Sequence, residues 1–336
     1  PMRDGTILRA DVWRPDAEGE FPVLIERTPY DKTGSSESNL GAGEFYGSHG
    51  YAVLIQDVRG RFASDGEFYP FRDDGDGDKK DGFDTVEWAA EQSWSNGKIG
   101  TIGGSYSGAT QYRMLATQPP HLTAQFSRQS SADYYDEWVY RSGAFEHGFN
   151  VMWTLKQTAT NARKLAAAGA EDATDKSVNQ ASDNYQKWLE YSPISPLPPV
   201  AELHDWFTDW MNHPNHDDFW EEFSNARSHD RVNVPVHHFG SWFDCFLAGT
   251  IRNFSGMSSK AATPEARNGQ RMTIGPWVHN PGPADMREAG DVDFGEQAKL
   301  GWFEMRLRWF DHWLKSVDNG VDSDKPVKLF AMGINK

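Results

Sequence analysis

Residues 99–109 read Ile-Gly-Thr-Ile-Gly-Gly-Ser-Tyr-Ser-Gly-Ala, a short apolar run that passes into small residues around two serines. A run of this kind is typical of a strand buried on both faces. Gly103 lies two residues before Ser105, and Ser107 and Gly108 follow it by two and three residues. A nucleophile elbow, the sharp turn from strand to helix that exposes a serine, needs small residues at these places. The segment therefore predicts a strand, a tight turn at Ser105 and a helix.

The motif is not strict around either serine. Around Ser105, Ser107 occupies the position of the second glycine of G-x-S-x-G; around Ser107, Ser105 and Ala109 stand where both glycines are required. An ordinary glycine-rich turn between a strand and a helix is the alternative interpretation. We take Ser105 as the candidate nucleophile, followed by a helix over residues 109–116.

Apolar runs on both sides of this segment predict the rest of the fold. Helical periodicity occurs over residues 81–92 and 296–317, and strand-like runs alternate with helical patterns. This alternation predicts a mostly parallel, doubly wound α/β sheet. The strand-like runs are residues 7–13, 22–26, 51–57, 99–103, 122–126, 234–239, 272–274 and 327–332.

The alternation stops between residues 131 and 230, which are rich in Ala and Trp, helical in pattern and interrupted by Pro193, Pro196, Pro198 and Pro199. We expect a helical cap over residues 131–230, inserted into a core formed by residues 1–130 and 231–336.

The acidic run over residues 73–81 has two interpretations. Asp74, Asp76 and Asp78 have the spacing of a calcium loop, but Lys79 replaces the required Gly and Thr85 replaces the bidentate Glu. We therefore expect a solvated loop that leads into the helix.

Composition excludes several classes of protein. The 33 Lys and Arg against 49 Asp and Glu give a net charge of −16, which disfavours binding to nucleic acids and anionic membranes. Cys245 is the single cysteine, so no internal disulfide can form. No apolar run is long enough to cross a membrane, and no leader is visible. These patterns leave the compartment open between the cytoplasm and secretion, because the start at Pro1 allows for a removed leader.

Two strand ends downstream carry polar groups. Residues 234–244 form a strand-like run that ends at Asp244, and residues 272–279 form another that ends at His279. α/β-Hydrolases order their triad as serine, acid and histidine along the chain, and the ends of parallel strands meet at one edge of the sheet. We expect Asp244 to orient His279, and His279 to accept the Ser105 proton. Asp57 and Asp230 remain rival carboxylates.

Two other candidates are weaker. Cys245 lacks an elbow and has the character of a small buried hydrophobe. The His213-Pro-Asn-His-Asp-Asp218 segment could suggest a metal, but its spacing favours a capped helix start at residues 217–222.

Several further motifs match one family. The chain resembles the bacterial cocaine esterase group of X-Pro dipeptidyl-peptidase-like hydrolases along essentially its whole length. The matching segments are Met2-Arg-Asp-Gly-Thr6, Arg27-Thr-Pro-Tyr-Asp-Lys32, Gln56-Asp-Val-Arg-Gly60, Ser64-Asp-Gly-Glu67, Trp94-Ser-Asn-Gly97, Asn212-His-Pro-Asn-His-Asp217 and Gly275-Pro-Trp-Val-His279.

This resemblance implies an α/β-hydrolase fold with Ser105, Asp244 and His279 as its triad. It implies an oxyanion hole made by the Tyr30 hydroxyl and the backbone N–H of Tyr106, and an acyl pocket lined by Trp138, Trp153 and Phe246. The aromatic flanks of Asp244 disfavour the amino-ester hydrolase subtype. The family continues into a C-terminal β-sandwich domain, which we expect to be absent from this chain.

The expected activity is that of a serine carboxylesterase acting through an acyl-enzyme on a small-molecule ester or amide. An X-Pro dipeptidyl peptidase, a glutaryl β-lactam acylase and a silent binding module on the same fold are the alternatives. No cofactor or metal is expected, and homo-oligomerisation is left open.

Overall fold

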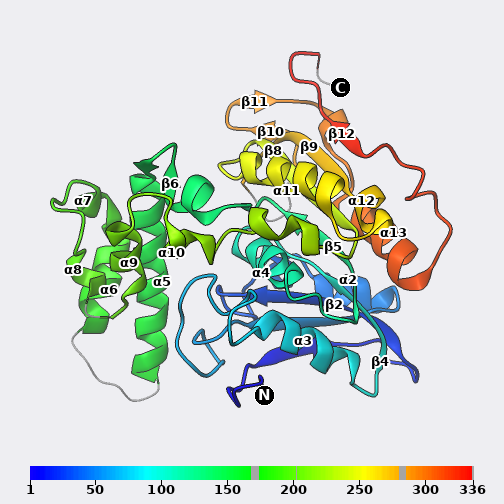
Figure 1. Cartoon of the computed structure of the whole chain (residues 1–336), viewed down its shortest axis with the longest axis horizontal. Helices are drawn as coiled ribbons and strands as arrows, with labels where there is room; N and C mark the ends of the chain where they lie inside the picture. Colours follow the sequence, from blue (N-terminus) through cyan, green and yellow to red (C-terminus); the bar gives the residue numbers. More distant parts are fainter. Residues whose placement is uncertain (168–173, 202, 280–284, 335–336) are drawn as a thin grey trace.

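A computed structural model describes residues 1–167, 174–201, 203–279 and 285–334 (Figure 1). Its centre is an eight-stranded sheet in the order β1-β3-β2-β4-β5-β8-β9-β12. β1 is antiparallel to β3, and the other neighbouring pairs are parallel. The strands are β1 (Ala10–Trp13), β2 (Phe21–Thr28), β3 (Ala52–Asp57), β4 (Ser95–Thr101), β5 (Leu122–Arg128), β8 (Val236–Phe243), β9 (Arg271–Val278) and β12 (Val327–Leu329).

Helices cover both faces of this sheet. Val23 and Ile25 of β2 pack into one core with Val86, whereas Leu24 packs into the opposite core with Tyr46 and Phe310. Alternate side chains thus supply two cores, as expected for a parallel sheet buried on both faces. The first face is covered by α3 (Asp81–Ala90), α4 (Tyr106–Leu115), α11 (Leu247–Lys260) and α12 (Pro264–Asn268), and the second by α2 (Ala42–Ser48) and α13 (Trp302–Lys315), with α1 (Ser36–Asn39) before α2.

The predicted fold class is confirmed, and every predicted strand lies in this sheet with its ends shifted by a few residues. The helix predicted over residues 296–317 is partly wrong. A 3-10 turn, η4 (Glu296–Ala298), precedes α13, which begins only at Trp302. Gly301, at φ 70°, adopts a left-handed conformation that separates the two elements.

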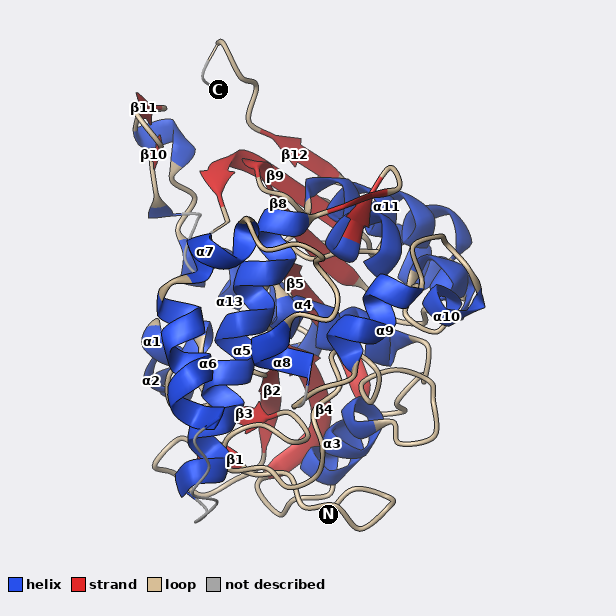
Figure 2. Cartoon of the chain, turned by 90° about the vertical axis from the view of Figure 1, so that its left-hand side faces the viewer, coloured by secondary structure: helices blue, strands red, loops and turns tan. Residues whose placement is uncertain are grey.

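The chain between β5 and β8 is mostly helical and lies beside the sheet, where Figure 2 shows it towards the viewer. Its aromatic core includes Trp206, Trp210 and Trp220 and continues onto Tyr106 of α4. The division into core and cap at residues 131 and 230 stays a prediction. The elements are η1 (Tyr135–Val139, a π-helix), β6 (Tyr140–Arg141), β7 (Ala144–Phe145), α5 (His147–Ala167), α6 (Thr174–Asp183), α7 (Tyr185–Leu189), α8 (Pro198–Ala201), α9 (Trp206–Asn212), α10 (Asp218–Glu221) and the 3-10 helix η2 (Ala226–Arg231).

A small hairpin, β10 (Glu288–Ala289) with β11 (Val292–Asp293), lies between β9 and α13. None of the helices in the described part of the chain has both the length and the apolar character needed to span a membrane.

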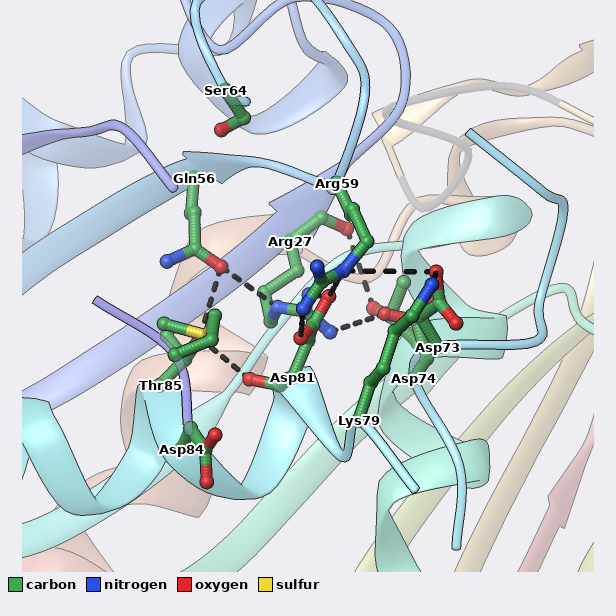
Figure 3. A network of polar contacts seen from close by, with 12 residues as sticks. Arg27, Gln56, Arg59, Ser64, Asp73, Asp74, Lys79, Asp81, Asp84 and Thr85 are labelled. Carbon is green, nitrogen blue, oxygen red and sulfur yellow. Dashed lines mark hydrogen bonds and ion pairs between the residues drawn. The ribbon is translucent and has the colours of Figure 1, made fainter. Parts of the chain in front are cut away.

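A buried network of charges ties the loop after β3 to the sheet (Figure 3). Arg27 of β2 pairs with Asp74, and its guanidinium lies 3.9 Å from Asp81. Arg59 donates to both carboxylate oxygens of Asp81, at 2.9 and 2.6 Å, and lies 3.7 Å from Asp73. Asp81 is the first residue of α3 and its side chain is fully buried. One network of ion pairs therefore joins the strand, the loop and the helix.

This network corrects the expectation of a solvated loop over residues 73–81. Asp74 pairs with Arg27, and Asp76 pairs with Arg231 from η2. Two of the three carboxylates that mimic a calcium loop are therefore engaged by arginines that lie far away in the sequence, and Asp78 is exposed.

We predict that Asp81→Asn destabilises the fold by about 3–5 kcal/mol, because it leaves two buried arginines without their shared carboxylate. Urea unfolding monitored by circular dichroism measures the loss. Asp84→Asn is the matched control on the same helix, since Asp84 pairs with the partly exposed Arg3 and should cost no more than about 1 kcal/mol. Equal effects of the two variants would contradict the importance of the buried network.

Candidate active site

Ser105 lies at the turn between β4 and α4 with φ 57° and ψ −122°. Positive φ is unusual for a residue other than Gly and costs free energy unless the surroundings hold it. The backbone N–H of Ser105 donates to the Arg128 carbonyl of β5 at 3.0 Å, and the Ser105 carbonyl accepts from Gly108 and Ala109. Contacts on both sides of Ser105 thus hold the sharp turn.

Glycines make this turn possible. A Cβ on Gly103 would lie 2.6 Å from the Cβ of Ser107, and a Cβ on Gly108 would lie 2.8 Å from the Cβ of Ser130. Both distances are too short for ordinary side-chain contact, so the helix can start this close to the strand only with glycine at these positions. The geometry has the character of a nucleophile elbow centred on Ser105.

The structure places the two candidate serines differently. Ser105 is part-buried at the turn, whereas Ser107 is buried within α4. The Ser107 hydroxyl donates to Glu26 Oε1 at 2.9 Å, and the Ser35 hydroxyl donates to Glu26 Oε2 at 2.6 Å. Ser107 therefore has a structural partner beneath the turn.

Asp244 and His279 directly follow β8 and β9, which are adjacent parallel strands. Asp244 Oδ1 lies 3.0 Å from His279 Nδ1 and also accepts the backbone N–H of Phe246 at 3.1 Å. The Asp244 side chain is fully buried and that of His279 is 37% exposed. A carboxylate on Nδ1 holds the imidazole in the tautomer that leaves Nε2 free to accept a proton.

The rival carboxylates have other roles in the structure. Asp57 accepts the backbone N–H groups of Lys32 at 2.7 Å and Ala63 at 3.1 Å, so it fixes two loops. Asp230 is exposed in η2. Of the three candidate acids, Asp244 is the one that the structure places against His279.

Cys245 and the His213 segment also have structural explanations. Cys245 is exposed, so the expectation of a buried cysteine is wrong. Partial desolvation of the thiol and the nearby Asp244 carboxylate raise the pKa of Cys245 to about 12, so the thiol stays protonated near neutral pH. Its sulfur lies at the same corner, since ligand atoms of Asp244, Cys245 and His279 are within 4.8 Å of one another. Asp217 accepts from the backbone N–H of Phe219 and caps α10, which confirms the predicted helix start.

Tyr30 follows β2, the strand that pairs with β4, and therefore lies on the same edge as Ser105. Its hydroxyl accepts a hydrogen bond from Trp153 Nε1 at 3.2 Å. Burial raises the pKa of Tyr30, and hydrogen bonding with Trp153 and Ser105 together with the charge of Arg61 opposes this rise. A protonated phenol that accepts from Trp153 keeps its own hydrogen for another acceptor.

Tyr106 is the first residue of α4. The first N–H groups of a helix have no acceptor within the helix and carry its positive dipole end. The Tyr106 side chain is buried, and its hydroxyl accepts the backbone N–H of Phe71 at 2.9 Å. Of the two groups predicted for the oxyanion hole, Tyr30 thus follows the neighbouring strand β2, and the Tyr106 N–H directly follows Ser105 at the start of α4.

The three predicted pocket residues form one aromatic group next to His279. Trp138 stacks on Phe246 with ring centroids 4.6 Å apart and meets Trp153 edge-on at 5.8 Å. Phe246 meets the imidazole of His279 edge-on at 5.4 Å. Three segments that are distant in sequence therefore meet at one wall.

Three buried residues around this site were not predicted from the sequence. Phe71 stacks on Tyr106 at 4.6 Å, Glu26 lies beneath the elbow, and Arg61 bonds to the carbonyl that precedes Tyr30. Glu26 directly precedes the family-matching segment Arg27–Lys32, and Arg61 directly follows Gln56–Gly60. This proximity is the one signal in the sequence that could have drawn attention to them.

Comparison with known protein families shows the family of this chain. The model of the X-Pro dipeptidyl-peptidase (S15) family matches residues 4–281. The chain belongs to this family. The cocaine esterase of Rhodococcus sp. (strain MB1 Bresler) is 33% identical over 347 residues, which cover 100% of this chain and 58% of the esterase. The chain therefore spans less than two thirds of that relative.

Two solved structures share the fold. An aminopeptidase from a marine sediment Thaumarchaeota archaeon is 24% identical, with a TM-score of 0.78 over 100% of this chain and 56% of that protein. A CocE/NonD family hydrolase from Staphylococcus aureus is 23% identical, with a TM-score of 0.69 over 98% and 51%. These likenesses support the α/β-hydrolase fold.

We predict that Glu26→Gln makes stability less dependent on pH. Burial and the neighbouring Glu37 raise the pKa of Glu26, against the hydrogen bonds from Ser35 and Ser107 and the charge of Arg128. The folded state thus binds the Glu26 proton more tightly than the unfolded state, so wild-type stability falls as pH rises from the ordinary carboxyl range through the raised pKa.

Urea unfolding at pH 5, 7 and 9 should show Glu26→Gln gaining stability over wild type as pH rises. Glu91→Gln, at the exposed end of α3, is the control and should follow the wild-type pH dependence. If the free energy of unfolding of Glu26→Gln changed with pH in the same way as that of wild type, Glu26 would not be held protonated.

Proposed function

We propose that the chain is a serine hydrolase that cleaves carboxylic esters through an acyl-enzyme. Ser105 is the nucleophile, His279 the general base and Asp244 the group that orients it. The observation that carries the proposal is the buried Asp244 carboxylate at 3.0 Å from His279 Nδ1, on the same sheet edge as the Ser105 elbow.

The reaction follows from these roles. Ser105 Oγ attacks the carbonyl carbon while its proton passes to His279 Nε2. The tetrahedral intermediate collapses when the bond to the leaving oxygen breaks, and that oxygen takes the proton from His279. Water then repeats both steps on the acyl-enzyme, which releases the acid and restores Ser105.

The oxyanion of the tetrahedral intermediate is stabilised by the Tyr30 hydroxyl and the Tyr106 N–H. Both are neutral donors held by their surroundings, Tyr30 by Trp153 and Tyr106 by its place at the start of α4. Donors arranged in advance stabilise the charge without the cost of reorganisation during the reaction.

The preference for esters rests on the 33% identity to the Rhodococcus cocaine esterase. The aromatic wall of Trp138, Trp153 and Phe246 is suited to an apolar, preferably aromatic, acyl group. Turnover of a phenyl ester compared with the anilide of the same acid tests this choice. A higher rate with the anilide would favour the peptidase or acylase alternatives.

We predict that Ser105→Ala lowers kcat on p-nitrophenyl acetate by a factor on the order of 10⁶, because the nucleophile is lost. Ser107→Ala is the matched control two residues away, and it should retain most of the activity because Ser107 bonds to Glu26 in the core. Steady-state kinetics with circular dichroism distinguishes the two serines. An inactive, folded Ser107→Ala beside an active Ser105→Ala would reverse the assignment.

We predict that Tyr30→Phe lowers kcat by about 10²–10³ with little change in KM, because the lost hydrogen bond is strongest when charge has developed on the oxygen. Tyr69→Phe removes a comparable hydroxyl, one bonded to Asp209 at 2.9 Å, and is the control. The same ester assay gives both values. A kcat for Tyr30→Phe as close to wild type as that of Tyr69→Phe would remove Tyr30 from the mechanism.

A further inference from the structure

Arg61 is a buried arginine beside the candidate oxyanion hole, and the reaction described above does not use it. Its side chain is 1% exposed. Nε donates to the Pro29 carbonyl at 3.0 Å, and Nη1 donates to the Gln157 carbonyl at 2.9 Å. Nη2 donates to Gln157 Oε1 at 3.1 Å and to Thr160 Oγ1 at 3.0 Å. Four hydrogen bonds to neutral oxygens therefore fix the guanidinium in one place.

The charge of Arg61 lacks a direct counter-ion. Among the residues that the structure describes, no carboxylate forms an ion pair with it. The same holds there for buried Arg113 and Arg271, whereas buried Arg27, Arg59 and Arg306 each have one. The guanidinium lies over the rings of Phe68 at 4.9 Å and Phe62 at 5.1 Å, which compensates only part of the charge. Burial lowers the pKa of Arg61 to about 10, so the group still carries its proton near neutral pH.

Arg61 is linked to Tyr30 through the backbone. Pro29, whose carbonyl it binds, directly precedes Tyr30. Gln157 and Thr160, which hold the other end of the guanidinium, belong to α5, and so does Trp153, whose indole donates to the Tyr30 hydroxyl. Trp153 and Gln157 are four residues apart and lie on the same side of the helix. α5 thus holds the Tyr30 segment at two points, directly through Trp153 and indirectly through Arg61.

The electrostatic effect has the sign that the reaction needs. The positive charge of Arg61 lowers the pKa of Tyr30, which makes its hydroxyl a stronger donor. A stronger donor stabilises a developing oxyanion in the transition state more than the neutral carbonyl of the ester. A buried cation without a counter-ion is costly for folding, which is consistent with a role in function.

We propose that Arg61 is a positioning residue of the oxyanion hole: it fixes the Pro29–Tyr30 segment to α5, and its charge strengthens hydrogen bonding from Tyr30 to the oxyanion. This inference rests on the proposed role of Tyr30. It assigns to Arg61 an action through Tyr30, without contact with the substrate.

The test is a double-mutant cycle of Arg61→Met with Tyr30→Phe, measured as kcat and KM on p-nitrophenyl acetate. Methionine keeps an unbranched aliphatic stem and leaves no unpaired charge, so we expect the fold to persist in circular dichroism. Arg61→Met should lower kcat roughly 10- to 100-fold with KM within about threefold of wild type, less than the loss of a direct donor. In the Tyr30→Phe background it should cost less than about threefold in kcat, because the group through which it acts is gone.

Two further variants sharpen the result. Arg61→Lys keeps the charge but cannot bind Pro29 and Gln157 together, so its kcat should fall between wild type and Arg61→Met. If Arg61→Met does not fold, the same cycle with Arg61→Lys replaces it. Arg72→Met, an arginine on the same loop stacked on Tyr69, is the control and should leave kcat unchanged.

Each possible result either supports or overturns the role of Arg61. A kcat within threefold of wild type for Arg61→Met, or an equal loss in both Tyr30 backgrounds, would overturn the role of Arg61 while the hydrolase assignment stands. A Tyr30→Phe variant with wild-type kcat would remove Tyr30, and with it the proposal for Arg61. Retained activity in Ser105→Ala would instead overturn the proposed function itself.

Discussion

The backbone at Ser105 is the constraint on which the site depends. Its φ of 57° is unusual for a residue other than Gly. The Arg128 carbonyl of β5 holds this conformation, and glycines around the turn let α4 start against the strand. The strand order then determines which groups surround the turn. β2 on one side supplies Tyr30, and β8 and β9 beyond β5 supply Asp244 and His279. The edge formed by the carboxyl ends of parallel strands is where open α/β sheets bind their ligands.

Much of this arrangement can be predicted from sequence, because it depends on local patterns. Each strand of the main sheet overlaps a strand-like run of the sequence, and Asp244 and His279 directly follow two of the strands. The start of α13 could not be predicted in this way, because the apolar spacing continues across Gly301 although the backbone turns there. The burial of Asp74 was also missed, because its partner Arg27 lies 47 residues away on another element. The positions of Phe71 and Arg61 against Tyr106 and Pro29 depend in the same way on tertiary contacts.

The buried arginines differ in how their charge is compensated. Arg27, Arg59 and Arg306 are compensated by carboxylates, and they connect loops and helices to the sheet. Such pairs contribute little net stability compared with apolar residues, but breaking one is costly, so they specify one arrangement. Arg61 is held by neutral oxygens and aromatic rings, next to the segment that carries Tyr30. Its uncompensated charge is better explained by a role in the candidate active site than by a contribution to the stability of the fold.

The central claim is that Ser105 is the nucleophile of an acyl-transfer site, and covalent labelling tests it most directly. A fluorophosphonate transfers its phosphonyl group to an activated serine and releases fluoride. Trypsin should then cleave after Lys98 and Arg113 and give residues 99–113, which contain both Ser105 and Ser107. Tandem mass spectrometry of this peptide locates the adduct. If Ser105 is the nucleophile, we expect a single adduct on Ser105, and we expect it to be lost in His279→Ala. An adduct on Ser107, or an unlabelled peptide from a sample that still hydrolyses esters, would contradict it.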